Sequence, residues 1–131
     1  VVFSGMKAPK YFFTTVKRHG ALLAKGRMLG IQFDTLFTDQ LYFNISRHAI
    51  TMATRIRSIF QKHGIAIAYD SPTNQQFVVL SPTLYDALSK KVAFEIWERK
   101  SDTEIICRFV TSWATKEEEL DELDHILQTL K

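Results

Sequence analysis

The chain has 131 residues, the size of one ordinary domain. Hydrophobic residues make up 46% of it and aromatic residues 12%, which is enough for a packed core and excludes a disordered chain. Charges interrupt every apolar run, so we expect no membrane-spanning helix and no membrane partner. The single cysteine, Cys107, excludes an internal disulfide and indicates a reducing compartment, so we expect a cytoplasmic protein.

The net charge of +3 is unevenly distributed along the chain. Basic residues dominate before the first acidic residue, Asp34, whereas acidic residues cluster from Glu117 to Asp124. A basic first third can attract phosphate, carboxylate or nucleic acid. The phenylalanines of the same region recur at helical spacings that suit packing rather than base stacking. We therefore interpret the basic residues as a solvated helix face and expect no nucleic-acid partner.

The first half of the chain has the pattern of helices. An apolar stub at 1–3 is followed by Pro9 and by apolar steps of three and four, which predict an amphipathic helix over 9–24. A helical or irregular apolar stretch continues over 28–37. The clearest helix is predicted over 39–63, with Gly64 as its C-cap. Its apolar residues advance by four, three, four and four: Ile45, Ala49, Met52, Ile56 and Phe60.

The second half alternates short strands and helices. Ser81-Pro82 predicts a capped helix reaching Lys90, and Thr115 with Glu118 forms a capping-box signature before a closing helix. That helix carries the stripe Leu120, Leu123, Leu127 and Leu130. Strands are predicted over 65–69, 77–80, 92–97 and 104–110, the last two as an antiparallel hairpin. The order predicts an α+β fold, with a small, mainly antiparallel sheet of three to four strands covered by helices.

No motif of a catalytic or metal site is present in the sequence. The four histidines show no i, i+4 pairing with a further ligand, and Cys107 has no partner nearby. A serine nucleophile elbow, a phosphate-binding loop and a dinucleotide glycine motif are also absent. We therefore predict no metal and no catalytic residue in this chain.

Arg108 is the most informative single residue. It lies in the apolar strand Ile105–Val110, where an unpaired charge is costly to bury. Alternation places Arg108 on one face with Ile106 and Val110, and Cys107 and Phe109 on the other. A guanidinium on an apolar face requires an anionic partner, and the planar fork of a carboxylate suits it. From the strand alone, an internal salt bridge or a solvent-facing edge is the simpler interpretation.

Three segments resemble the low-specificity threonine aldolase and β-eliminating lyase family. They follow one another in the family's order and, with the helices between them, extend over nearly the whole chain. The segments are Arg18–Phe33 (RHGALLAKGRMLGIQF), Ser71–Phe77 (SPTNQQF) and Arg108–Trp113 (RFVTSW).

The resemblance implies a fold-type-I pyridoxal-phosphate enzyme, in which a large cofactor domain precedes a small C-terminal domain. The chain 1–131 would be that small domain, with 1–7 as the stub of a large-domain strand, 8–37 as connecting helices and 38–131 as the α+β domain. The family's cofactor-binding lysine precedes the stub. We therefore expect the isolated chain to bind no pyridoxal 5'-phosphate and to be inactive.

The resemblance also implies an activity and partners. The intact protein would be a lyase that cleaves a β-hydroxy-α-amino acid to glycine and an aldehyde. Its partners would be the amino-acid substrate, the N-terminal cofactor domain and further copies in a homodimer or homotetramer. Arg108 matches the family arginine that binds the substrate α-carboxylate. Arg27 matches a basic position near the cofactor site and the dimer interface, and Asn74 falls in an element with a turn or packing role.

Three alternatives stay open at this point. The first is β-elimination, in the manner of tryptophanase or cysteine desulfhydrase. The second is a stand-alone binding module whose basic first helix holds an acidic partner. The third is a purely structural interaction domain, which would be favoured if the sheet shows no cleft around Arg108.

Overall fold

The computed structural model describes residues 8–130, so the predicted strand stub lies outside the described residues. The chain divides into two compact units, 1–41 and 42–131, and each is described by itself. The first unit contains the helices α1 (Phe12–Arg18) and α2 (Gly26–Phe37) and the 3-10 helix η1 (Thr38–Gln40).

The helices of the first unit differ from the predicted ones in length and regularity. The helix predicted over 9–24 is wrong in extent, because α1 is only seven residues long. Gly20 adopts a φ of +68°, a left-handed conformation that ends the helix. The stretch that was expected to be helical or irregular is the regular helix α2. No residue of α1 or α2 is buried within the described part of the chain.

The long helix α3 (Leu41–Lys62) confirms the strongest prediction. Its buried residues follow the expected stripe, from Ala49 to Phe60. At its end the Gly64 N–H donates to the Gln61 carbonyl (2.9 Å) and the Ile65 N–H to the Phe60 carbonyl (2.9 Å), the two bonds of a Schellman motif. Gly64 has a φ of +76°, so the predicted glycine cap is present for the expected steric reason.

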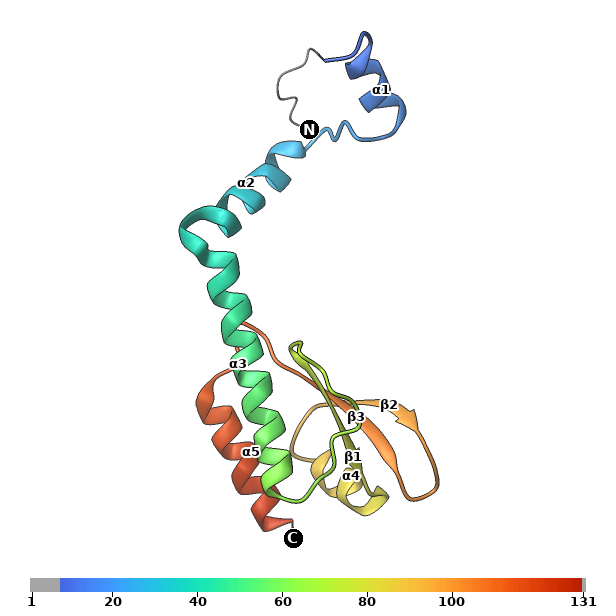
Figure 1. Ribbon diagram of the computed structural model, residues 1–131, viewed down its shortest axis with the longest axis vertical. Helices are drawn as coiled ribbons and strands as arrows, with labels where there is room; N and C mark the ends of the chain where they lie inside the picture. The colour runs from blue at the N-terminus through green and yellow to red at the C-terminus, as the bar shows by residue number, and fades with distance from the viewer. Residues whose placement is uncertain (1–7, 131) are drawn as a thin grey trace. The chain divides into compact units, whose positions relative to one another are not determined.

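The second unit contains a three-stranded antiparallel sheet, which confirms the predicted α+β class (Figure 1). The strands are β1 (Gln75–Leu80), β2 (Glu95–Arg99) and β3 (Ile105–Val110), in the order β1-β3-β2. The predicted hairpin is the β2–β3 pair. It contains a bulge, because Ile96 opposes Cys107 and Glu98 opposes Ile106, which leaves Trp97 without an opposite residue.

The strand predicted over 65–69 is wrong. Only Ile67 forms a bridge, with Val78 of β1, supported by a hydrogen bond from the Ala68 N–H to the Phe77 carbonyl (2.9 Å). Beyond this point Asp70 is held in an ion pair with Arg57 of α3, at 2.5 Å. The segment therefore pairs with β1 only at this single bridge.

Both helices predicted in the second half are present. The helix α4 (Pro82–Leu88) begins at Ser81, whose Oγ accepts a hydrogen bond from the Leu84 N–H (3.2 Å). The helix α5 (Glu117–Thr129) is capped one residue later than predicted. The Glu119 carboxylate accepts from the Lys116 N–H (3.0 Å), whereas the Thr115 hydroxyl accepts from a loop N–H, that of Ser112 (2.9 Å).

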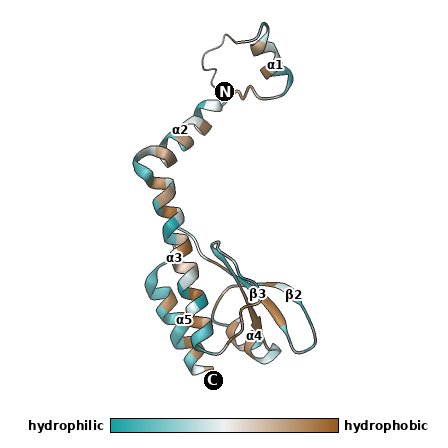
Figure 2. Cartoon of the chain, viewed as in Figure 1, coloured by the Kyte–Doolittle hydropathy of each residue, from teal (hydrophilic) through white to brown (hydrophobic). Residues whose placement is uncertain are grey.

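The core lies between the sheet and the helices α3 and α5, which are side by side (Figure 1). Alternate residues of β1 and β3 enter it, and the inner residues of β3 are Ile105, Cys107 and Phe109. The Phe109 ring lies between Phe60 of α3 (4.8 Å) and Phe94 (4.6 Å). Aromatic contacts of this kind each add about 0.5–1.5 kcal/mol to the gain from burial. The strand β3 is correspondingly coloured as hydrophobic over most of its length in Figure 2.

The helices α3 and α5 run in the same direction and are joined by ion pairs along their exposed seam. Arg55 pairs with two acidic residues of the first turns of α5, and Lys62 and His63 both pair with Asp124 (2.6 Å each). The hydrogen bond from Lys62, and then the one from His63, lower the pKa of Asp124 below its ordinary value. The acidic tail of the sequence therefore neutralises the basic side of α3.

The lowered pKa of Asp124 predicts a pH-dependent contribution to stability. A carboxyl whose pKa is lower in the folded state stabilises the fold above its unfolded pKa, and the effect disappears as the pH falls through the folded pKa. We expect Asp124→Asn to lower the urea midpoint at about pH 7, and the difference from wild type to vanish towards about pH 2. Asp102→Asn, in the exposed β2–β3 turn, is the control. A difference for Asp124→Asn that is constant with pH would contradict the assignment.

Candidate functional site

The outer face of β3 carries Arg108. The face turned away from the core presents Ile106, Arg108 and Val110, as the alternation predicts. Ile106 is buried and Val110 is exposed, and the Arg108 side chain lies between these extremes with 27% of its area exposed. Arg108 is therefore partly desolvated, and its surroundings determine what it can bind.

Three side chains from the neighbouring strands surround the guanidinium of Arg108. Its Nη1 donates to the Gln75 side-chain oxygen (3.2 Å), and its Nη2 forms an ion pair with the Glu95 carboxylate. Its Cζ lies 5.3 Å from the centre of the Trp97 ring, in cation–π contact. The Nε is buried without a hydrogen-bond partner among the described residues. Because Nε is buried, an incoming anion can reach Arg108 only at Nη1 and Nη2, the two nitrogens that Gln75 and Glu95 contact.

The strand register explains why these residues meet. Phe77 of β1 and Glu95 of β2 are the Cα partners of Arg108 on its two sides. Gln75 is two residues from Phe77 and so lies on the same face. Trp97 is two residues from Glu95 and so lies on the same face, where its ring contacts Phe77 (5.2 Å) and Arg108.

The aromatic residues extend this face beyond Arg108. The Phe77 ring lies between Trp97 and Tyr69, at 5.2 and 5.5 Å, and Trp97 and Tyr69 are both about half exposed. The Tyr69 hydroxyl donates to the Glu98 carboxylate (3.1 Å), and this hydrogen bond raises the pKa of Tyr69. We call Tyr69, Gln75, Phe77, Glu95, Trp97 and Arg108 the outer-face cluster.

Four hollows can be described on the second unit, and Arg108 lines none of them. One, of about 380 Å³, lies on the same face of the sheet, between the segment 66–69 and the ends of β2 and β3. Its lining includes Tyr69, Glu98 and Ile106. In the unit taken alone, Arg108 therefore lies on a surface rather than in one of these hollows, which is the condition that favours the third alternative, a purely structural interaction domain.

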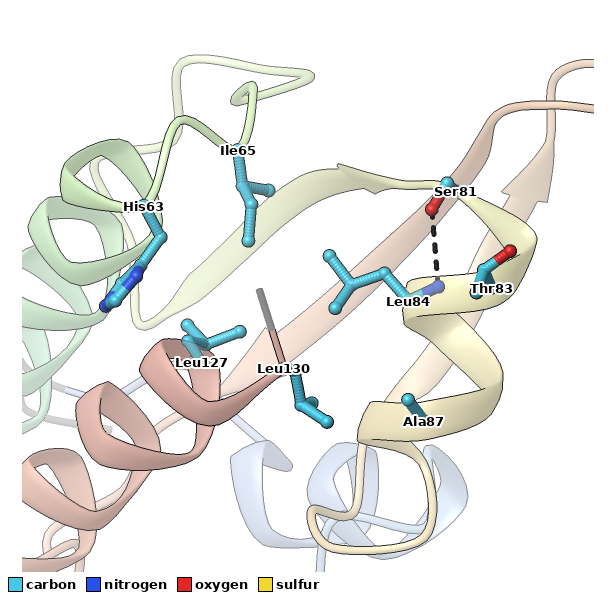
Figure 3. Close-up of a pocket in the computed structure, with 8 residues that line it drawn as sticks. All are labelled: His63, Ile65, Ser81, Thr83, Leu84, Ala87, Leu127 and Leu130. Atoms are coloured by element: carbon cyan, nitrogen blue, oxygen red, sulfur yellow. Dashed lines mark hydrogen bonds between the residues drawn. The ribbon is translucent and has the colours of Figure 1, made fainter.

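A second hollow, of about 230 Å³, opens between the end of α3, α4 and α5 (Figure 3). Its walls are mainly apolar, with Leu84, Leu127 and Leu130 projecting into it. Two of the polar groups at its rim have structural roles, since Ser81 caps α4 and the Nε2 of His63 pairs with Asp124.

Neither a metal site nor a reactive thiol is found in the described residues. No group of three or more histidine, cysteine or acidic side chains there could hold a metal ion.

No helix among these residues is long and apolar enough to cross a membrane. Cys107 is buried on the inner face of β3, and burial raises the pKa of its thiol to about 11.

The raised pKa and the burial of Cys107 predict an unreactive thiol. The thiolate is the reactive form, and a rise of about two pKa units reduces its population roughly a hundredfold at mildly alkaline pH. We expect an aromatic disulfide reagent to modify native Cys107 at least about a hundredfold more slowly than the urea-unfolded chain. Equal rates in the two states would show that Cys107 is accessible and would contradict its position in the core.

Arg27 and Asn74 lie in different parts of the chain. Arg27 is an exposed residue of α2 in the first unit, and its cofactor or interface role stays a prediction. The Asn74 side-chain amide donates to the Thr111 carbonyl (2.7 Å), and the Asn74 main-chain carbonyl accepts from the Thr111 N–H (3.0 Å). The Thr111 hydroxyl donates to the Ala49 carbonyl of α3 (2.7 Å). Asn74 therefore joins the start of β1 to the end of β3, as a packing residue would.

Sequence reasoning identified Arg108 but not its neighbours. Glu95, Gln75 and Trp97 come from two other strands, and the pairing that brings them to Arg108 depends on the register between strands. The predicted hairpin alone could have indicated Glu95, because cross-strand neighbours of opposite charge attract each other and Glu95 lies opposite Arg108.

Comparison with known proteins gives a match among solved structures. No family model and no curated protein matches the chain. Among solved structures, the chain is similar to a threonine aldolase from Leishmania major, with 35% sequence identity and a TM-score of 0.82. The match covers 91% of this chain and 35% of the aldolase, so this chain spans about a third of that protein's length. The predicted resemblance to a threonine aldolase, and the predicted fold of its small C-terminal domain, are confirmed.

Proposed function

We propose that this chain is the small domain of a pyridoxal-phosphate-dependent lyase of the threonine aldolase type. The complete enzyme would cleave a β-hydroxy-α-amino acid to glycine and an aldehyde. The observation that carries the proposal is the similarity to the Leishmania major threonine aldolase over 91% of the chain, at 35% identity. The position of Arg108 supports it, because the outer face of the sheet offers a cation to an anionic ligand.

Arg108 would bind the α-carboxylate of the substrate. Its backbone lies in a strand that is hydrogen-bonded on both sides. Its guanidinium is held by Gln75 and Trp97. A guanidinium held in this way binds a carboxylate in a defined orientation. In a lyase of this kind the orientation of the carboxylate selects which bond at Cα is broken, so Arg108 would direct cleavage to the Cα–Cβ bond.

The described residues fit the substrate carboxylate better than the cofactor. The side chains that contact Arg108 are Gln75, Glu95 and Trp97, and none has an amine that could bind pyridoxal phosphate covalently. When bound, the cofactor supplies an electron sink for the bond that is broken at Cα. We propose that an N-terminal domain holds it, that Arg27 lies near it at the dimer interface, and that the isolated chain is inactive.

The first unit supports partners for this domain. Large apolar side chains of α1 and α2 are exposed within the described residues, including Phe13, Met28 and Phe33, each with more than 60% of its area accessible. Exposed apolar residues in such numbers indicate a contact surface. About two thirds of the Leishmania major aldolase lies outside the match. We propose that an N-terminal domain and a second copy of the chain cover this surface, in a homodimer or homotetramer.

The products of threonine test the reaction. In the retro-aldol reaction the Cα–Cβ bond breaks, the β-hydroxyl loses its proton and becomes the aldehyde, and Cα takes up a proton. We expect the chain joined to its N-terminal domain and loaded with pyridoxal phosphate to form glycine and acetaldehyde in equal amounts. Residues 1–131 alone should form neither. Release of ammonia and a keto acid without glycine would instead indicate the β-eliminating alternative.

Replacement of Arg108 tests the carboxylate role in the same protein. A charge-assisted hydrogen bond contributes about 1.5–3 kcal/mol, so Arg108→Ala should raise the KM for threonine roughly ten- to hundredfold. Arg99→Ala is the matched control, because Arg99 lies at the other end of β2, opposite Ile105, and should leave the KM unchanged. An unchanged KM for Arg108→Ala would remove the carboxylate role.

A further inference from the structure

We propose that Glu95 occupies the place of the substrate carboxylate on Arg108 and must be displaced when the substrate binds. The inference rests on the proposed function, since it concerns the same guanidinium. Its observation is the ion pair between the Arg108 Nη2 and the Glu95 carboxylate, the one anion that contacts Arg108 among the described residues. A substrate carboxylate has the same charge and the same two-oxygen geometry as Glu95.

The two ends of this ion pair differ in their surroundings. The Glu95 side chain has 69% of its area exposed, compared with 27% for Arg108. Glu95 is also the first residue of β2, which is an edge strand of the sheet. Ion pairs with an exposed partner contribute little to stability, because water solvates the released carboxylate well. Glu95 can therefore leave at low cost, while Arg108 stays in place.

The other contacts of Arg108 explain why it would stay. Neither Gln75 nor Trp97 carries a charge. Gln75 accepts a hydrogen bond from Nη1, and the Trp97 ring contacts the face of the guanidinium. A partly buried cation without any anion is unfavourable, and Glu95 provides that anion when the site is empty. Arg108 would therefore keep its orientation in both states and exchange one carboxylate for another. Only a ligand with its own negative charge replaces what Glu95 provides, so the exchange favours amino acids over their uncharged derivatives.

Glycine binding measures this competition directly. The pyridoxal-phosphate-loaded complete protein would be titrated with glycine by calorimetry, as wild type and as Glu95→Gln. The glutamine has the same shape and still accepts a hydrogen bond, but it lacks the charge. An exposed ion pair of ordinary strength predicts that Glu95→Gln binds glycine about two- to fivefold more tightly. Damage to the site would change the affinity in the opposite direction.

Glu98→Gln is the matched control. Glu98 is an acidic residue of the same strand that pairs with Tyr69 instead of Arg108, so its replacement should leave glycine affinity unchanged. The inference is overturned if Glu95→Gln binds glycine no more tightly than wild type, or if Glu98→Gln gives an equal gain. Arg108→Lys separates the two proposals, because wild-type glycine affinity in that variant would refute the carboxylate role itself, whatever Glu95 does.

Discussion

The structure depends on the position of β3, which is hydrogen-bonded to β1 on one side and to β2 on the other. A strand paired on both sides cannot shift by one residue without moving its entire core face into solvent. The inner residues of β3 are buried against α3 and α5, so the register is firmly set. The same register places Arg108 on the outer face, with Phe77 and Glu95 as its direct neighbours.

The two faces of the sheet have different tasks. The inner face is apolar and holds Phe109 between two other rings, which secures the strand to α3. The outer face combines one cation with aromatic side chains, of which Trp97 and Tyr69 are about half exposed. Helices that covered both faces would have left Arg108 with no access for a ligand.

Arg108 has one interpretation in the second unit alone and another in the proposed complete enzyme. Within the second unit it takes part in an internal ion pair with Glu95, as the simpler interpretation of the strand anticipated. Under the proposed function, a substrate carboxylate would compete for the same guanidinium. These two interpretations are compatible, because a partly buried arginine requires an anion in both the empty and the occupied state. Gln75 and Trp97 serve both states, since neither carries a charge.

Elements whose signals are local can be predicted from the amino-acid sequence alone. The helix α3 with its glycine cap, the stripe of α5, the Ser81 cap and the alternation that separates Arg108 from Cys107 all follow from spacings of a few residues. Features that depend on contacts between distant segments are visible only in the tertiary structure. The segment 65–69 forms a single bridge instead of a strand, and Glu95, Gln75 and Trp97 meet Arg108 through strand pairing. Such contacts leave no periodic pattern, because each is set by the register of two strands rather than by the residues of one.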